Sequence, residues 1–495
     1  MLLSGCALPS KRGMEQSTHL SLEQAVETRL GTAIHDEQQQ HPGNSAVYPL
    51  IQAQDAFAAR VMLIRSADKS LDLQYYIWQN DISGQLLFEE LHHAAERGVR
   101  VRLLLDDLGA SGLDQSLWHL TQHPMVEVRL FNPFVQRQFK WLGFIYDFPR
   151  LHRRMHNKAL IADNQFTIVG GRNIGDAYFG ATDDVVFSDL DVLVAGEVVQ
   201  DVSQDFDLYW NSQASYPAER LIKEPSKAPA PASTTQSARA NSYRQAVQQS
   251  DFMQQLVNHE LELQWVPVRM VSDSPDKVLN RGGKEKNLMP QLRAIIGQPN
   301  QQILLVTPYF VPTKAGVQAF TELAKSGIDI QILTNSLAAT DVAIVHSGYA
   351  KYRKALLKAG IRLFELKRTS GSDEQKRLTK ALSSSSASSL HAKTFAIDGE
   401  TVFVGSFNFD PRSAHLNTEL GFVVQSTELA EQMQQVFRDL LLFSAYEVKL
   451  GQGNRLYWQE TTSSGTMLHS TEPESSALRR LGVRLLGMLP IEWLL

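Results

Sequence analysis

The sequence predicts an α/β protein made of two similar lobes that pack against each other as a pseudo-two-fold dimer. Three observations lead to this prediction. A strand–helix–strand pattern at 70–107 returns at 301–336, a strand–turn–strand pattern at 156–173 returns at 391–408, and both patterns occur in the same order. A repeat of this size indicates two copies of one structural unit. The 495 residues are enough for two to four domains of ordinary size.

The first pattern in each copy joins two apolar strand runs through a segment with helical periodicity. Gly98 and Gly327 stand where these helices should end, because glycine readily takes the left-handed conformation that closes a helix. A helix between two strands implies that the strands run parallel. The second pattern is a hairpin, with turns expected at Asp163–Asn164 and Asp398–Gly399.

Composition divides the chain further. We expect an N-terminal segment at 1–45, a first lobe at 46–222 and a second lobe at 246–450. The linker at 223–245 is rich in Pro, Ala, Ser and Thr, which cannot build a core. The tail at 451–495 is expected to carry an amphipathic helix.

The net charge and the cysteine content limit which binding partners and which cellular compartments fit the sequence. A net charge of −5 and a pI near 6.3 argue against a dedicated nucleic-acid binder. The single cysteine, Cys6, follows Leu-Ser-Gly, which resembles a bacterial lipobox without its charged region and most of its apolar region. Two locations therefore stay open: a periplasmic lipoprotein if Cys6 is lipidated, and otherwise the cytoplasmic face of the inner membrane. No apolar run approaches the roughly 20 residues that cross a bilayer, so we expect peripheral association.

The two hairpins repeat one polar spacing. Its members are His156, Lys158 and Asp163 in the first copy and His391, Lys393 and Asp398 in the second. Strand residues two apart share a face, so each His–Lys pair can meet one substrate. Each aspartate falls in a turn. We expect it either to shape that turn or to pair with a nearby cation. With ordinary residue usage, two such matches would arise by chance on the order of 1 time in 1,000.

Two half-sites of this kind suit a phosphodiester substrate. One neutral imidazole can attack phosphorus and form a phosphohistidine, while the other, protonated, gives its proton to the leaving alkoxide. Lys158 and Lys393 would attract the non-bridging oxygens. Asn173 and Asn408, which end both hairpins in Gly-x-x-Asn, would donate N–H groups to the same oxygens.

Each imidazole also needs a partner that sets its tautomer and supports its cationic form. Asp189 and Glu419 occupy matching positions at the start of the next strand runs, and we expect them to orient the histidines. We expect no cofactor and no metal. A lysine beside each histidine would repel a cation, and the sequence shows no His, Cys and carboxylate cluster at metal spacing.

These residues closely resemble the paired HxKxxxxD signature of the phospholipase D superfamily. The resemblance covers 55–448, and within the superfamily 405–422, QYYIW at 74–78 and PIEWLL at 490–495 are similar to bacterial cardiolipin synthases of the C type. The resemblance implies two phospholipase D-like lobes, each a mixed, mostly parallel sheet flanked by helices. They would share one active site, so that a monomer suffices.

The activity that the resemblance implies is metal-independent phosphatidyl transfer. Phosphatidylglycerol or phosphatidylethanolamine would donate a phosphatidyl group, and a phosphatidylglycerol hydroxyl would accept it to form cardiolipin. The N-terminal histidine is usually the nucleophile in this superfamily, so His156 is expected as nucleophile and His391 as the acid–base group. The alternatives are a phospholipase D-type hydrolase of phospholipids or, less favoured, of nucleic acid, and a non-catalytic lipid-binding protein.

Two segments are expected to contact the membrane surface. At 475–495, apolar residues share one helical face that arginines avoid. They are Leu478, Leu481, Leu485, Met488 and Leu489, with Arg480 and Arg484 off the face. At 134–154, aromatic residues alternate with basic ones that suit headgroups, namely Arg137, Lys140, Arg150, Arg153 and Arg154. The alternatives are a C-terminal helix docked on the core and a packed helical hairpin with a solvated basic edge.

Overall fold

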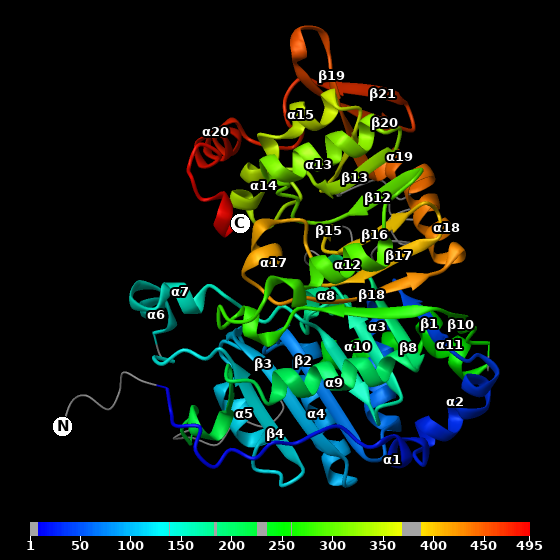
Figure 1. The fold of residues 1–495 in the computed structure, drawn as a ribbon, viewed down its shortest axis with the longest axis vertical. Helices are drawn as coiled ribbons and strands as arrows, with labels where there is room; N and C mark the ends of the chain where they lie inside the picture. Colours follow the sequence, from blue (N-terminus) through cyan, green and yellow to red (C-terminus); the bar gives the residue numbers. More distant parts are fainter. Residues whose placement is uncertain (1–7, 138, 183–185, 225–234, 259, 369–387) are drawn as a thin grey trace.

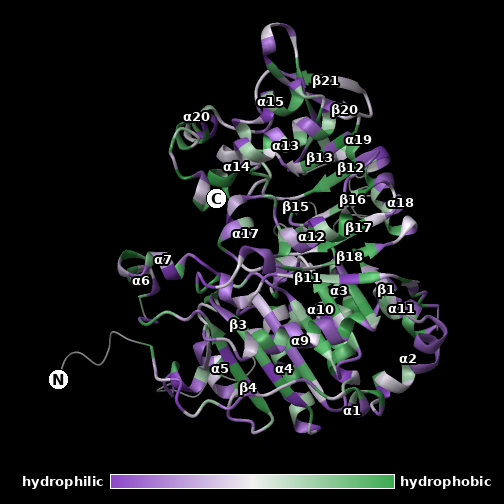
Figure 2. Ribbon diagram, viewed as in Figure 1, coloured by the Kyte–Doolittle hydropathy of each residue, from purple (hydrophilic) through white to green (hydrophobic). Residues whose placement is uncertain are grey.

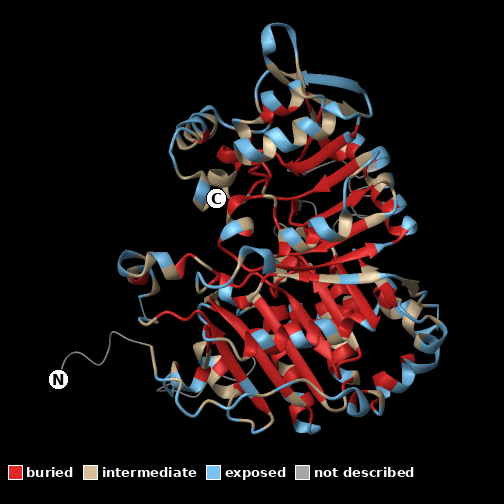
Figure 3. Cartoon of the chain, viewed as in Figure 1, coloured by how far each residue is buried: buried red, intermediate tan, exposed pale blue. Residues whose placement is uncertain are grey.

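The structure is a computed structural model that describes the chain except for residues 1–7, 138, 183–185, 225–234, 259 and 369–387. Figure 1 shows two lobes stacked along the long axis, the first coloured mainly blue to green and the second mainly green to red. Each lobe is built on one large sheet. The central strands of both sheets are the most continuously buried and apolar parts of the molecule (Figures 2 and 3).

The sheet of the first lobe has the strand order β10-β1-β8-β6-β5-β2-β3-β4-β9. Its strands are β1 (Ser45–Leu50), β2 (Ser70–Ile77), β3 (Arg100–Gly109), β4 (Val126–Phe131), β5 (Ala159–Ala162), β6 (Phe166–Gly170), β8 (Asp191–Gly196), β9 (Ser215–Pro217) and β10 (Gln264–Val266). Helix α4 (Ile82–Glu96) connects the parallel strands β2 and β3, as the sequence predicts. Gly98 closes this connection with a φ of 89°.

The sheet of the second lobe has the strand order β11-β18-β17-β16-β12-β13-β14-β19-β20-β21. Its strands are β11 (Val268–Ser272), β12 (Gln302–Val306), β13 (Asp329–Asn335), β14 (Arg362–Leu366), β16 (Thr394–Ile397), β17 (Thr401–Gly405), β18 (Leu420–Gln425), β19 (Ala445–Leu450), β20 (Leu456–Thr462) and β21 (Gly465–His469). The order β8-β6-β5-β2-β3-β4 in the first lobe therefore matches β18-β17-β16-β12-β13-β14 in the second. The repeat seen in the sequence is a repeat of topology.

Both sheets are mixed, as predicted, but the expectation that they are mostly parallel is wrong. Among the described strands, only β2–β3 and β3–β4 in the first sheet and β12–β13 and β13–β14 in the second pair in parallel. The other pairings are antiparallel because hairpins such as β5–β6 and β16–β17, and the edge strands beyond them, reverse the chain direction without a helical crossover.

Helices cover both faces of each sheet. In the first lobe they are α1 (Leu22–Val26), α2 (Arg29–Gln40), α3 (Ala53–Ser66), α4, α5 (Asp114–Leu120), α6 (Lys140–Tyr146), α7 (Phe148–Leu151), α8 (Asp176–Phe179), α9 (Val198–Trp210), α10 (Ala238–Gln248) and α11 (Asp251–Val257). In the second they are α12 (Leu288–Ile296), α13 (Thr313–Lys325), α14 (Ala343–Ala350), α15 (Arg353–Lys358), α17 (Pro411–His415), α18 (Thr427–Gln435), α19 (Leu441–Ser444) and α20 (Ala477–Leu486). Among the described residues, no helix combines the length and the hydropathy that a bilayer-spanning segment needs.

One apolar core joins the lobes. Residues of α9 and of the first sheet, such as Phe206 and Val194, belong to the same buried cluster as Met433 of α18 and Val404 of the second sheet. The outer faces of the sheets have separate cores, formed with α3 and α4 in the first lobe and with α12 and α13 in the second. The lobes therefore pack through their inner faces as one continuous body.

The boundary between the lobes differs from the expected division at 246. Helices α10 and α11 pack on α3, with Tyr243 and Phe252 buried in the core of the first lobe. Strand β10 then extends the first sheet by pairing with β1. The expected linker at 223–245 also ends too late, since α10 begins at Ala238. The second sheet begins only at β11, because apolar residues of α10 and α11 cover the outer face of the first lobe.

Candidate active site

Backbone pairing between the lobes brings the two HxK segments together. The short strands β7 (Val186–Ser188) and β15 (Ser388–Leu390), one from each lobe, run parallel as a two-stranded sheet. The backbone N–H of His391 donates to Ser188 O at 2.7 Å. In the matching place, the N–H of His156 donates to Thr418 O at 2.9 Å.

The side chains cross between the lobes in the same way. His156 Nδ1 lies 2.8 Å from Glu419 Oε2, and His391 Nδ1 lies 2.5 Å from Asp189 Oδ2. All four side chains are buried. The carboxylates that we expected to orient the histidines therefore contact them, but each comes from the opposite lobe. An Nδ1–H bound to a carboxylate leaves Nε2 with its lone pair for chemistry.

The residue behind each carboxylate differs between the half-sites. Gly171 lies so close to Asp189 that a Cβ atom on the glycine would stand 2.0 Å from Oδ1. In the second lobe Ser406 occupies the matching position after β17 and donates its hydroxyl hydrogen to Glu419. Beside His391, the Asp189 carboxylate thus packs against the backbone of Gly171. Beside His156, the longer Glu419 side chain is bound by the Ser406 hydroxyl.

Both lysines are buried cations directed at the histidine segments. Lys158 Nζ donates to His156 O at 2.5 Å, and Lys393 Nζ donates to His391 O. Burial lowers the pKa of Lys158 to about 7 and that of Lys393 to about 8, and the nearby Glu419 and Asp189 oppose the shift. The site therefore concentrates positive charge whose protonation changes near neutral pH.

Burial and the neighbouring lysines favour neutral imidazoles. The pKa of His156 lies well below its usual value because of burial and the charges of Lys158, Lys393 and His391. Burial and Lys393 also lower the pKa of His391, although Asp189 opposes the shift. An anionic phosphate bound between them would raise both values, since a nearby negative charge favours the cation.

The two carboxyl groups have opposite pKa shifts. Burial raises the pKa of Glu419 to about 7. Burial acts in the same direction on Asp189, but the charges of His391, Lys393 and Arg172 outweigh it and hold its pKa below the usual value. Asp189, beside His391, is therefore ionised at neutral pH. Glu419, beside His156, changes its protonation near pH 7.

The two asparagines sit in matching places with different bonds. Asn173 accepts the N–H of Ile77 at 3.1 Å and donates from Nδ2 to the hydroxyl of Tyr178 at 3.0 Å. Asn408 is also buried, and its Oδ1 has no hydrogen-bond partner among the described residues. The structure thus ties Asn173 into the framework of the first half-site and leaves the Asn408 amide oxygen unpaired.

The two motif aspartates lie at the far ends of β5 and β16 from the histidines. The Asp163 carboxylate accepts three backbone N–H groups at 2.8–2.9 Å, those of Asp68, Lys69 and Ser70. Asp398 accepts those of Asn300, Gln301 and Gln302 at 2.8–2.9 Å. Both have left-handed φ values, 50° and 54°. They shape the hairpin turns and secure the starts of β2 and β12 instead of facing the substrate.

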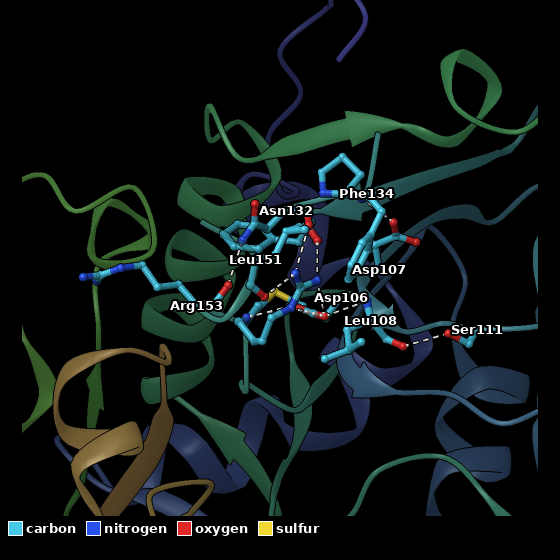
Figure 4. Close-up of polar contacts among 12 residues, drawn as sticks. Asp106, Asp107, Leu108, Ser111, Asn132, Phe134, Leu151 and Arg153 are labelled. Carbon is cyan, nitrogen blue, oxygen red and sulfur yellow. Dashed lines mark hydrogen bonds and ion pairs between the residues drawn. The ribbon is translucent and has the colours of Figure 1, made fainter. Parts of the chain in front are cut away.

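Asp106 and Asn335 are site residues that our sequence reasoning missed. Asp106, near the end of β3, accepts the N–H of Met155 at 2.9 Å and binds Arg154 (Figure 4). Asn335, at the end of β13, accepts the N–H of Leu390 at 3.0 Å. Each secures the residue just before a motif histidine. The available signal was a polar residue that ends an otherwise apolar strand run at matching places in the two copies.

Aromatic rings, also missed, surround the imidazoles unequally. The Tyr76 ring meets His156 edge-on with centroids 5.0 Å apart. Tyr178 and Phe187, both from the first lobe, lie 5.2 and 5.1 Å from the His391 ring. No group of three or more His, Cys, Asp or Glu side chains in the described part of the chain is arranged to hold a metal ion.

Comparisons with known proteins agree with this geometry. The family model described as "Cardiolipin synthase, PLD-like domain" matches residues 61–210 and 292–441. Cardiolipin synthase C of Escherichia coli (strain K12) is 46% identical over 473 residues, which cover 94% of this chain and 100% of that protein. A cardiolipin synthase of Staphylococcus aureus (strain Mu50) is 26% identical over 406 residues, covering 82% of this chain and 69% of that protein.

Among solved structures, phosphatidylserine synthase of Haemophilus influenzae Rd KW20 has a similar fold. The TM-score is 0.56 at 15% sequence identity, and the match covers 91% of this chain and 96% of that one. At this identity the likeness concerns the two-lobed α/β architecture alone.

Proposed function

The chain belongs to the phospholipase D superfamily and, within it, to the cardiolipin synthase family, and we propose that it makes cardiolipin by phosphatidyl transfer through a phosphohistidine. The observation that best supports this proposal is the crossed pairing of His156 with Glu419 and of His391 with Asp189. Two imidazoles that each present Nε2 beside two buried lysines can divide one phosphodiester exchange into two in-line steps.

We assign His156 as the nucleophile. Its Nε2 attacks the phosphorus of the donor, phosphatidylglycerol or phosphatidylethanolamine, and the P–O bond to the headgroup alkoxide breaks. Attack needs a neutral imidazole, which burial and the lysines favour at His156. As the N–P bond forms, Nδ1–H becomes more acidic, and Glu419 stabilises the developing positive charge.

His391 serves as the acid–base group. It must carry a proton when the donor is bound, and Asp189 supplies the lasting negative charge that stabilises an imidazolium. The donor phosphate adds a second negative charge. His391 gives its proton to the leaving headgroup oxygen and is left neutral, ready for the second step.

In the second step a phosphatidylglycerol hydroxyl replaces the departed headgroup. Neutral His391 takes the hydroxyl proton as the oxygen attacks phosphorus, and the N–P bond to His156 breaks. Cardiolipin leaves, His156 is neutral again and His391 is protonated, so the cycle closes without net acid or base. We propose that Lys158 and Lys393 stabilise the charge on the non-bridging oxygens in both steps, with Asn173 and Asn408 near the same oxygens.

The other site residues have supporting roles in this proposal. Asp163 and Asp398 hold the turns from which the histidine strands are positioned. Phospholipids are the proposed substrates and the membrane surface the proposed location. Cys6 lies outside the described residues, so both compartments in the sequence prediction, periplasmic lipoprotein and cytoplasmic face of the inner membrane, remain predictions.

Lipid analysis tests the function. We expect a bacterial host without cardiolipin synthases of its own to accumulate cardiolipin when it expresses this chain, as measured by mass spectrometry. The His391→Ala variant, expressed to the same level, should give none. In purified form, the chain should convert phosphatidylglycerol labelled in its glycerol headgroup to labelled cardiolipin. Release of phosphatidic acid alone, with every donor combination, would favour the hydrolase instead.

A further inference from the structure

Exposed apolar side chains gather on two elements, one in each lobe. Seventeen large hydrophobic residues are exposed among the described residues, and ten of them lie in two short stretches, 139–146 and 478–493. The ten are Phe139, Trp141, Ile145, Tyr146, Leu478, Leu481, Leu485, Met488, Leu489 and Trp493. We call these ten side chains the docking face. Concentration in two stretches marks an interaction surface, whereas single exposed leucines would not.

In the first lobe, the basic residues hold α6 so that its aromatic face points outward. Arg137 and Lys140 both bind Asp107, and Arg137 also binds Asp114. Trp141 and Ile145, one helical turn apart, are 63% and 73% exposed. The prediction that the basic residues of 134–154 face lipid headgroups is therefore wrong for Arg137, Lys140 and the buried Arg154, since internal carboxylates already neutralise them. The aromatic residues are the ones left to contact a partner.

In the second lobe, helix α20 is both docked and amphipathic. Val483 is 4% exposed where α20 packs on α14. The opposite face presents Leu478, Leu481 and Leu485, which are 52–82% exposed. The alternative of a helix docked on the core is therefore confirmed for one face, and membrane contact by the exposed apolar face stays a prediction. The exposed Arg484 lies beside the apolar face.

The two elements lie on one side of the molecule (Figure 1), and the C-terminal tail contacts the segment that precedes His156. In Figure 1, α6 and α20 project from the same side, with the C-terminal residues between them. The Trp493 ring meets His152 edge-on at 6.1 Å, which joins the tail to the segment after α7. His152 stands four residues before His156, and its carbonyl accepts a hydrogen bond from Arg412 at 2.6 Å. A partner bound to the docking face would therefore sit next to the histidine segment.

We propose that the docking face binds the surface of a bilayer that contains anionic phospholipid, through one element of each lobe at once. This proposal rests on the proposed function, because a phosphatidyl transferase draws both substrates from such a surface. Trp and Tyr favour the headgroup layer, leucines enter the acyl boundary, and Arg484 is attracted to anionic headgroups. The apolar side chains come from two short stretches, 139–146 and 478–493, one in each lobe, and a deformable lipid surface can contact both at once.

Two anchors are needed because each is small. Helix α6 has seven residues and α20 has ten. A single short anchor gives marginal, reversible binding, and a second one converts it to stable attachment. Since the anchors come from different lobes, binding both would also orient the shared active site toward the membrane. Loss of either anchor should weaken attachment without disturbing the histidines.

Vesicle sedimentation of the full chain tests the proposal. Ile145→Glu and Leu485→Glu should each lower the partition onto phosphatidylglycerol-containing vesicles about tenfold, and the double variant about a hundredfold. Two matched controls carry the same change at equally exposed leucines outside the docking face, Leu208→Glu on α9 and Leu468→Glu on β21, which are 61% and 66% exposed. Both controls should bind as the parent chain does.

A second assay separates this proposal from the proposed function. The same variants should transfer phosphatidyl groups between short-chain phospholipids, dissolved as monomers, within about threefold of the parent rate. If the parent chain transferred phosphatidyl groups between these lipids but did not bind vesicles, the docking face would be overturned and the proposed function kept. If the parent chain bound vesicles but transferred no phosphatidyl group, the proposed function would be overturned and the docking face kept. Equal losses in the control variants, equal binding to purely zwitterionic vesicles, or a change in self-association in place of vesicle binding would each overturn the proposal.

Discussion

The two half-sites share a backbone plan and differ in the acids that complete it. In each, a strand end holds the residue before a histidine, and a carboxylate from the other lobe binds Nδ1. His391 has Asp189 behind it, backed by the bare glycine Gly171. His156 has Glu419 with Ser406. The two copies thus share a symmetric backbone scaffold, and a few side-chain differences make the half-sites chemically unequal.

The residues that position the two histidine segments also differ between the half-sites. The Asp106 carboxylate binds the buried Arg154 and also accepts the N–H of the residue before His156. At the matching position, the neutral Asn335 accepts the N–H of the residue before His391. The ring of His391 is enclosed by Tyr178 and Phe187. Each half-site thus builds its own electrostatic surroundings on a common fold. On this inequality rests the proposal that His156 attacks phosphorus and His391 transfers protons.

The largest expected effect comes from removing one histidine at a time. With a phosphatidyl donor whose headgroup is nitrophenol, the leaving group needs no proton. His391→Ala should then release about one nitrophenol per chain and stop, because the second step lacks its base and slows by about 10²–10⁴-fold. His156→Ala should release none. Mass spectrometry of the trapped protein should locate the phosphatidyl group on His156, and an adduct on His391 would reverse the assignment.

An exchange at the position behind the carboxylates should have an intermediate effect. Gly171→Ser places a Cβ 2.0 Å from Asp189 Oδ1, so we expect the carboxylate to shift away from His391. We expect kcat/KM to fall about a hundredfold or more, since an acid–base group then loses its orientation. Ser406→Gly removes one hydrogen bond to Glu419 and should cost only about tenfold. Thermal unfolding serves as the control for folding, and equal losses would mean that the half-sites are interchangeable.

The smallest expected effect is a shift in pH dependence. The pKa of Lys158 is lowered to about 7 and that of Lys393 to about 8, so rising pH removes first one ammonium charge and then the other. We therefore expect kcat/KM to decline on the alkaline side of neutrality. Lys158→Arg keeps its charge at all these pH values and should move the decline upward, even at a lower maximum. Lys393→Arg should move it less. If both variants kept the parent pH dependence of kcat/KM, the lysines would not be the groups that cause the alkaline decline.

Much of the site was predictable because its signals are local. Periodicity of two places His156 and Lys158 on one face of a strand, and the repeated spacing marks His391 and Lys393 as their counterparts. The positions of Asp163 and Asp398 already suggested turns, where the structure finds them. The orientation of basic residues at 134–154 was not predictable, because Asp107, to which two of them bind, lies about 30 residues earlier in the chain.

By itself, the sequence determined the duplication, the order of strands and helices within each copy, and the matched spacing of the histidines and lysines on which the proposed chemistry rests. Those properties follow from periodicity, turn residues and side-chain type, which act over a few neighbouring residues. Only the tertiary structure decided that Glu419 serves His156 and Asp189 serves His391. It also decided that α10, α11 and β10 complete the first lobe. The reason is that contacts between residues hundreds of positions apart depend on how the inner faces of two sheets pack, and no local pattern encodes that arrangement.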